Sequence, residues 1–390
     1  MNFLYPVILF LLLTSAGVHA GGEPVRVGLD AEFGNKTSTA DDAIKVGLEI
    51  AIEEINQAGG VLGGRPLELV TRDNRGVPAR GVDNLKELAE IKDMTALVTS
   101  KFSPVVLAQL ESAHQLKLPL LAAWSAADTV IDHNHVPSYT FRLSLRDSWV
   151  MPRLLQEAKQ RGYKKVGLLI PNGAWGRSNL KAAETHAAKT PLPVITKTLI
   201  FEWSDPSLEN EYLELLKTGM DALLFVGNEP EVALLIKNMT ALPRDQWRPI
   251  LSHWGVAAGD LLSLVGNALY EVDLTTVQTF SFIDNPAPKA RRVLSAAMAK
   301  LNVAQARSIS SPVGIAHGYD LAHLLAHAIN KAGSTDRGAI RDALEGLGEY
   351  DGLVRKYKPP FTRERHEALG PEQLFMARWR KDGALAPVKP

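Results

Sequence analysis

A repeated alternation of short apolar strands and amphipathic helices constrains the fold of this chain more than any other feature. A strand pattern at 25–29 is followed by apolar residues at helical spacing within 40–56, and Ala58-Gly59-Gly60 ends that helix. The further predicted strands are 67–70, 95–99, 118–122, 165–170, 194–200 and 222–226. The predicted helices between them are 82–91, 104–115, a helix from about 176, 208–218 and 231–239. This order predicts parallel sheets with helices on both faces.

Two doubly wound α/β units fit this pattern better than one eightfold barrel, which is the main alternative. The predicted turn at 139–145 and the late helical block from Lys289 interrupt an even eightfold repeat. A chain of 390 residues is long enough for two such units. We therefore expect two α/β lobes.

The balance of charge disfavours several classes of partner. Lys and Arg number 43, and Asp and Glu also number 43, so no net field favours nucleic acid or an anionic membrane. The chain has no cysteine, which excludes disulfides, thiol nucleophiles, thiolate metal sites and a lipid-modified cysteine. A chain of this size can instead be stabilised by its hydrophobic core.

The first twenty residues have the pattern of an export signal. An apolar run at 3–13 is short for a membrane span, and Val18-His19-Ala20 has the small-x-small pattern of a cleavage site. We predict cleavage after Ala20 and a periplasmic location. An uncleaved membrane anchor is the alternative, since Met1-Asn2-Phe3 carries no Lys or Arg.

The loops that follow the predicted strands are where a ligand is expected in open α/β sheets. These loops contain aromatic residues together with a few hydroxyl and amide groups, a mixture typical of a pocket for a small molecule. The aromatic residues are Phe33, Phe102, Trp124, Trp175 and Trp254. For each tryptophan, core or interlobe packing is the alternative role.

Several motifs occur in the order found in a known family. They are Asn56 to Arg65 before a strand and Asp73, 96–99 leading to Ser103, Tyr139 to Arg142 with Asp147, Trp175-Gly176, and Gly318-Tyr319-Asp320 as the start of a long helix. Together they resemble the type I periplasmic solute-binding proteins of the branched-chain amino acid (leucine, isoleucine, valine) ABC transporters. The resemblance covers nearly the whole chain after residue 20.

The resemblance implies two lobes joined by three crossovers, which close around a ligand like a trap. The implied boundaries are 1–20 for the signal peptide, 24–144 with 277–350 for the N-terminal lobe, and 145–276 with 351–390 for the C-terminal lobe. The implied partners are a small-molecule ligand and the membrane permease and ATPase of an ABC transporter. We expect a monomer that binds no nucleic acid.

The resemblance also implies a ligand site, which matches the family only in part. A serine matched to Ser103 and a loop matched to 124–126 hold the ligand carboxylate, and Trp175 matches the aromatic residue that covers the ligand. Ser103 precedes Pro104, so helix capping is its alternative role. The predicted ligand-binding residues are Phe102, Ser103, Trp124, Ser125, Ala126, Trp175, Asn228, Glu229 and Trp254.

The family's acidic partner of the ligand ammonium aligns with Trp254 in this chain. An ammonium buried without a carboxylate costs several kcal/mol, so an ordinary α-amino acid is disfavoured. Glu229 and Glu32 are candidate replacements, each with a solvated surface position as the alternative. We expect a ligand with an apolar or aromatic body and a carboxylate or other polar head.

Catalytic and metal motifs are incomplete. His323 and His327 are spaced as in a zincin helix, but Leu324 occupies the place of the general base. His133 and His135 lie in a polar segment typical of a solvated loop. We therefore expect no enzyme activity, no catalytic residue, no metal and no cofactor.

Two functions remain open from the sequence. One is the binding component of an ABC importer. The other is a periplasmic sensing module that signals to a membrane kinase, cyclase or chemoreceptor. Both need only a trap that closes on a ligand.

Overall fold

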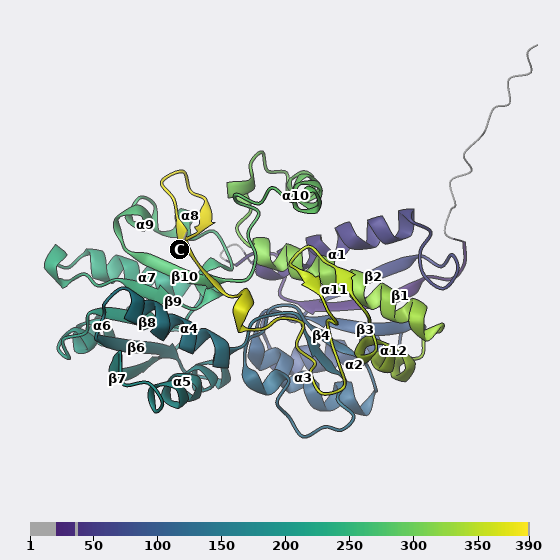
Figure 1. The fold of residues 1–390 in the computed structure, drawn as a ribbon, viewed down its shortest axis with the longest axis horizontal. Helices are drawn as coiled ribbons and strands as arrows, with labels where there is room; N and C mark the ends of the chain where they lie inside the picture. Colours follow the sequence, from purple (N-terminus) through teal and green to yellow (C-terminus); the bar gives the residue numbers. More distant parts are fainter. Residues whose placement is uncertain (1–20, 36–37, 389–390) are drawn as a thin grey trace, which may run out of the picture.

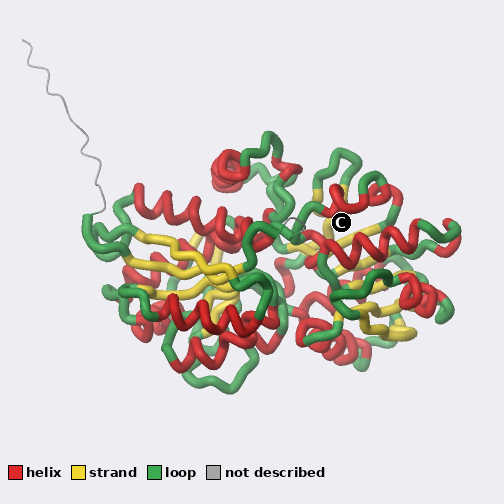
Figure 2. The backbone as a smooth tube through the Cα atoms, turned by 180° about the vertical axis from the view of Figure 1, so that it is seen from behind, coloured by secondary structure: helices red, strands yellow, loops and turns green. Residues whose placement is uncertain are grey.

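A computed structural model describes residues 21–35 and 38–388 of the chain. These residues form two α/β lobes that lie side by side (Figure 1). Viewed from behind, helices flank the strands of each lobe (Figure 2). The two-lobed α/β prediction is confirmed, and the eightfold barrel is excluded because the strands form two separate large sheets. The predicted signal peptide lies outside the described residues.

The first lobe contains a five-stranded parallel sheet in the order β2-β1-β3-β4-β5. Its strands are β1 (Val25–Ala31), β2 (Leu67–Asp73), β3 (Met94–Thr99), β4 (Leu120–Ala122) and β5 (Thr140–Arg142). The strand order reverses between β1 and β3, so the loops after these two strands diverge and leave a crevice at the carboxyl edge of the sheet.

Helices cover both faces of this sheet, with α1 and α11 on one face and α2 and α3 on the other (Figure 1). They are α1 (Ala40–Gln57), α2 (Pro78–Ala89), α3 (Ser103–Gln115), α11 (Pro312–Ala332) and α12 (Arg337–Glu345). The apolar positions predicted for the first helix, among them Ile44 and Leu48, are buried. Apolar periodicity therefore predicted the buried side of α1 correctly.

One sequence prediction in this lobe is wrong. Gly318 was expected to open a long helix, but it lies in the middle of α11, which begins at Pro312. A side chain at Gly318 would place its Cβ 2.4 Å from the carbonyl oxygen of Ile44 on α1. The glycine therefore serves the close packing of two helices rather than a helix start.

The second lobe contains a seven-stranded sheet in the order β14-β13-β10-β9-β8-β6-β7. Its strands are β6 (Lys165–Pro171), β7 (Val194–Phe201), β8 (Ala222–Phe225), β9 (Ile250–Ser252), β10 (Leu274–Gln278), β13 (Phe375–Trp379) and β14 (Leu385–Pro387). The first five in chain order are parallel to one another, and the strand order reverses between β6 and β8 as it does between β1 and β3 in the first lobe. Strands β13 and β14 are antiparallel additions from the C-terminal part of the chain.

Among the helices of the second lobe, α4 precedes β6 and the others lie between β6 and β10 in the chain. They are α4 (Asp147–Gln160), α5 (Ala174–Ala187), α6 (Glu209–Leu216), α7 (Glu229–Thr240), α8 (Leu261–Val265) and α9 (Ala268–Glu271). None of the helices in the described part of the chain is long and apolar enough to cross a membrane.

The chain passes between the lobes after β5, after β10 and before β13. Helix α10 (Pro288–Leu301) and a small hairpin of β11 (Tyr350–Asp351) and β12 (Lys356–Tyr357) lie between the second and third passages. The backbone N–H groups of Leu353 and Val354 donate to Asp320 of α11. These contacts attach Leu353 and Val354, just beyond the predicted boundary at residue 350, to the first lobe, and the lobe boundaries stay a proposal.

Candidate functional site

A small pocket lies where the carboxyl ends of the two sheets face each other. Its walls come from the loops after β3 and β4 of the first lobe and after β6, β8 and β9 of the second. The lining residues are Lys101, Phe102, Ser103, Trp124, Ala126, Trp175, Asn228, Trp254 and Gly255. The loops after β1, β3, β6 and β8 flank the reversals of strand order, where such sheets bind ligands.

Indole rings from both lobes meet in this pocket. Trp124 of the first lobe and Trp254 of the second have ring centroids 4.7 Å apart. On the other side of the pocket, Trp175 stacks on Trp203 at 6.4 Å with an interplanar angle of 6°. Phe102 contacts the edge of Trp203 at 5.9 Å, so an aromatic side chain of the first lobe extends this wall.

The two lobes are closed on each other around these rings. The backbone N–H of Thr39 in the first lobe donates to the carbonyl of Ala258 in the second at 2.8 Å. The backbone N–H of Asp128 donates to the Ser178 hydroxyl across the same interface at 3.2 Å. The enclosed cavity measures about 20 Å³, enough for a single water. A larger ligand therefore requires the lobes or the indole rings to move.

Trp175 is held in place by a buried Asp–His pair. The Asp147 Oδ1 atom accepts hydrogen bonds from Trp175 Nε1 at 3.2 Å and from His253 Nε2 at 3.0 Å. His253 Nδ1 accepts from the backbone N–H of Trp254 at 2.9 Å, which places the ring proton on Nε2. One carboxylate thus orients Trp175 directly and positions the loop that carries Trp254.

Gly255 is required by close approach rather than by backbone conformation. A Cβ atom at this position would lie 2.3 Å from the carbonyl oxygen of Gly227 and 2.9 Å from the ring of Trp175. Only a residue without a side chain lets the loop after β9 approach both of these groups.

The remaining predicted residues divide into two groups. Ser103 and Asn228 line the pocket, and the Ser103 hydroxyl accepts from the backbone N–H of Ala127 at 3.3 Å. Ser103 is the first residue of α3, and the N-cap position before it is occupied by Phe102. Ser125 and Glu229 are fully buried outside the lining.

Lys101 is the charged residue of the lining, and it is not among the ligand-binding residues predicted from the sequence. Its side chain is 10% exposed, its ammonium contacts the Ser38 hydroxyl, and it lies 4.0 Å from Glu32. Burial raises the pKa of Glu229 to about 7, and the positive charge of Lys101 opposes that rise. Glu32 is partly exposed, at 27% of its side chain.

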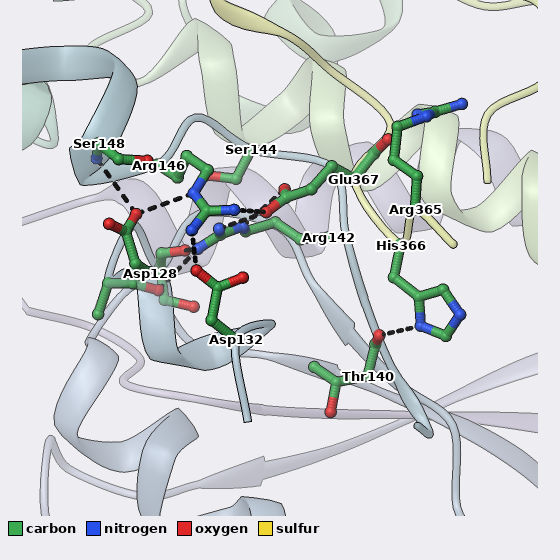
Figure 3. A network of polar contacts seen from close by, with 12 residues as sticks. Asp128, Asp132, Thr140, Arg142, Ser144, Arg146, Ser148, Arg365, His366 and Glu367 are labelled. Carbon is green, nitrogen blue, oxygen red and sulfur yellow. Dashed lines mark hydrogen bonds and ion pairs between the residues drawn. The ribbon is translucent and has the colours of Figure 1, made fainter. Parts of the chain in front are cut away.

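An ion network centred on the buried Arg142 joins the first and third passages between the lobes (Figure 3). Arg142, at the end of β5, donates to both carboxylate oxygens of Glu367, at 2.9 and 2.6 Å. Arg146, just before α4, also contacts Glu367 and pairs with Asp128 and Asp132. Arg142 is fully buried, so this network fixes the backbone that connects the lobes.

The histidine pairs singled out in the sequence lie away from the pocket lining. His323 packs on Tyr319 at 4.6 Å, and its Nε2 lies 3.6 Å from Glu54. His133 contacts the ring of His114 at 4.9 Å, and His135 stacks on the same ring at 4.1 Å. Within residues 21–35 and 38–388, no cluster of three His, Asp or Glu side chains is arranged to hold a metal ion.

The comparisons with known proteins agree with this architecture. A family model described as "Periplasmic binding protein" matches residues 24–384. The chain belongs to this family. Its members are solute-binding proteins rather than enzymes, and the family is one of exported, periplasmic proteins.

Relatives and solved structures cover nearly the whole chain at low identity. A Leu/Ile/Val-binding protein homolog 7 of Brucella abortus (strain 2308) is 20% identical, over 97% of this chain and 96% of its own length. The branched-chain amino acid transporter substrate binding protein LivJ from Streptococcus pneumoniae, in complex with isoleucine, has a TM-score of 0.78 at 20% identity and covers 94% of this chain and 100% of its own. An ABC transporter solute binding protein from R. palustris, in complex with benzoate, has a TM-score of 0.74 at 17% identity and covers 94% and 95%.

Proposed function

We propose that this protein is the binding component of an ABC importer and that its ligand is an organic carboxylate with an apolar or aromatic body and no ammonium group. The charge of the pocket wall carries the proposal. Of the nine lining residues in the described part of the chain, Lys101 alone is charged. Trp254 stands where the resemblance places the acid that pairs with an ammonium.

Electrostatics favour an anion in this pocket over a zwitterion. A ligand carboxylate near Lys101 and Ser103 gains a charge-assisted hydrogen bond. It also interacts favourably with the positive, N-terminal end of the α3 dipole. A ligand ammonium in the same space meets a like charge and no lining carboxylate, so it loses its hydration without compensation. An α-amino acid gains the first interaction but incurs the second cost.

The aromatic walls account for the other half of the ligand. Trp124, Trp175 and Trp254 present large apolar surfaces, and an aromatic pair contributes about 0.5–1.5 kcal/mol beyond its buried area. Solved proteins of this fold bind ligands with and without an ammonium group, since one is a complex with isoleucine and another with benzoate. The benzoate complex supports the proposal, because benzoate is an aromatic carboxylate without an ammonium group.

The decisive experiment compares acids that differ only in the ammonium group. Residues 21–390 are screened by thermal shift and titration calorimetry against 3-phenylpropanoate and phenylalanine, 4-methylpentanoate and leucine, and benzoate. The carboxylates are expected to raise the melting temperature because they bind only the folded protein. Tighter binding of leucine or phenylalanine than of its desamino acid would overturn the proposal.

Lys101→Met is the matching variant. A charge-assisted hydrogen bond contributes about 1.5–3 kcal/mol, so the affinity for the carboxylate should fall roughly ten- to a hundredfold. Lys356→Met, at an exposed position on β12, serves as the control and should leave binding unchanged. If the two variants bound the carboxylate with equal affinity, Lys101 would not contribute to ligand binding.

We further propose export after cleavage behind Ala20, a monomeric protein, and delivery of the ligand to a membrane permease. Deleting the gene should abolish cellular uptake of the acid identified in the screen. Loss of a chemotactic or regulatory response without loss of uptake would favour the sensing alternative.

A further inference from the structure

Glu229 is a buried carboxyl group that the proposed ligand contacts do not use. It is the first residue of α7, directly after the lining residue Asn228, and its side chain is completely buried. Neither carboxylate oxygen has a hydrogen-bond partner of normal geometry among the described residues. A buried carboxylate without such partners is costly, so the environment favours the protonated acid.

The charges that act on Glu229 come from both lobes. Lys101 of the first lobe attracts its carboxylate across the closed interface, and Glu231 of α7 repels it. The Lys101 ammonium is shared with other acids, because Glu32 lies 4.0 Å away and Asp41 attracts it as well. One positive charge thus faces several carboxyl groups.

Closure of the lobes creates this environment. Lys101 and Ser38, the two groups of the first lobe that act on Glu229, belong to a body that moves away when the trap opens. In the open protein, water then reaches the start of α7, and a solvated glutamate has a pKa of about 4.3. In the closed protein, burial raises the pKa of Glu229 to about 7.

We propose that closure around a carboxylate ligand is coupled to the uptake of one proton by Glu229. The inference rests on the proposed function, because it requires an anionic ligand. Binding without a proton would enclose the ligand anion and the Glu229 anion beside the single ammonium of Lys101. When Glu229 takes up a proton from solvent, it becomes neutral, and the Lys101 ammonium can pair with the ligand carboxylate. The protonated Glu229 then has an O–H group that can donate a hydrogen bond.

The sign of the pH dependence follows from linkage. The closed state binds the proton more tightly than the open state, so closure is favoured as the pH falls through the closed-state pKa. For pKa values of about 4.3 and 7 in the two states, ligand affinity should rise about tenfold from pH 8 to pH 6. At pH 6, about 0.9 proton should be taken up per ligand, and at pH 8 about 0.1.

The test is titration calorimetry of benzoate into residues 21–390 at pH 6, 7 and 8, in buffers that differ in ionisation enthalpy. Wild-type protein should show the stated proton uptake. Glu229→Gln mimics the neutral acid, so the same two pKa values predict roughly 450-fold tighter binding than wild type at pH 8, with no proton uptake assigned to this site. A merely structural role would weaken binding instead. Glu209→Gln, at the exposed first residue of α6, is the matched control and should behave as wild type.

Two outcomes would overturn the inference: benzoate binding without proton uptake at pH 6, or the same pH dependence in Glu229→Gln as in wild type. If no carboxylate binds, the proposed function fails, and thermal denaturation then tests Glu229 separately. Wild type should gain stability relative to Glu229→Gln as the pH falls from 8 to 6, and parallel profiles would refute the buried, proton-binding state.

Discussion

Replacing Glu367 by glutamine should destabilise the protein far more than removing a surface carboxylate. Arg142 is fully buried, and its guanidinium donates to both oxygens of Glu367 and to the carbonyls of Ser125 and Ala127. Glu367→Gln keeps the shape of the side chain but removes the negative charge. The Arg142 charge then remains in the interior with only neutral acceptors and the nearby Arg146 (Figure 3).

Breaking a buried ion pair in this way costs about 3–5 kcal/mol, whereas an exposed pair contributes about 0–1 kcal/mol. Urea denaturation followed by tryptophan fluorescence measures the difference, with Glu87→Gln as the control. Glu87 pairs with Arg72 and its side chain is 62% exposed. Its substitution should change the free energy of unfolding by less than about 1 kcal/mol.

A double variant separates loss of the pair from loss of packing. Arg142→Met with Glu367→Leu fills the site with apolar atoms of similar volume and should recover most of the lost stability. If the free energy of unfolding of Glu367→Gln lies within about 0.5 kcal/mol of the wild-type value, the buried pair does not contribute the stability assigned to it.

Two further predictions concern single buried positions. Gly255→Ala should weaken carboxylate binding at least tenfold and lower the stability of the second lobe by about 1–3 kcal/mol, because the new methyl group overlaps Gly227 and Trp175. Gly348→Ala is the control, since the Cβ atom added there meets no atom within 4 Å, and it should change neither binding nor stability. Burial raises the pKa of Asp320 to about 6, above its usual value of about 3.9, so its contribution to stability is complete below pH 3.9 and is lost as the pH rises through 6. Asp320→Asn should therefore flatten this part of the thermal denaturation profile, and an unchanged slope would contradict the assignment.

Elements with clear periodicity were predictable from the sequence. The strand at 165–170 and the helix at 40–56 each agree with the structure to within one residue at either end. Their apolar spacing depends on burial within one lobe, which local sequence reports directly. The predicted aromatic residues Trp124, Trp175 and Trp254 do converge, because the carboxyl ends of parallel strands meet at one edge.

Contacts between distant segments could not be predicted in the same way. Asp147 and His253 are 106 residues apart, and nothing in the local pattern around either residue reports their hydrogen bond. Lys101 lies in a loop that was predicted to bind ligand because of its aromatic and hydroxyl residues. Its charge becomes part of the pocket only through the closed interface between the lobes, which the local sequence does not report. The glycine contact between Gly318 and α1 is likewise a tertiary contact without a local signal.

Both lobes are completed by pieces that come late in the chain. The first lobe needs α11, which ends at Ala332, and the second sheet needs β13 and β14, which end at Pro387. A polypeptide synthesised from its N-terminus therefore cannot complete the first lobe before α11 has been made, nor the second sheet before β13 and β14 have been made. Such delayed folding would suit a protein that is threaded across a membrane before it acquires its structure, and neither lobe can be excised as one uninterrupted stretch of chain.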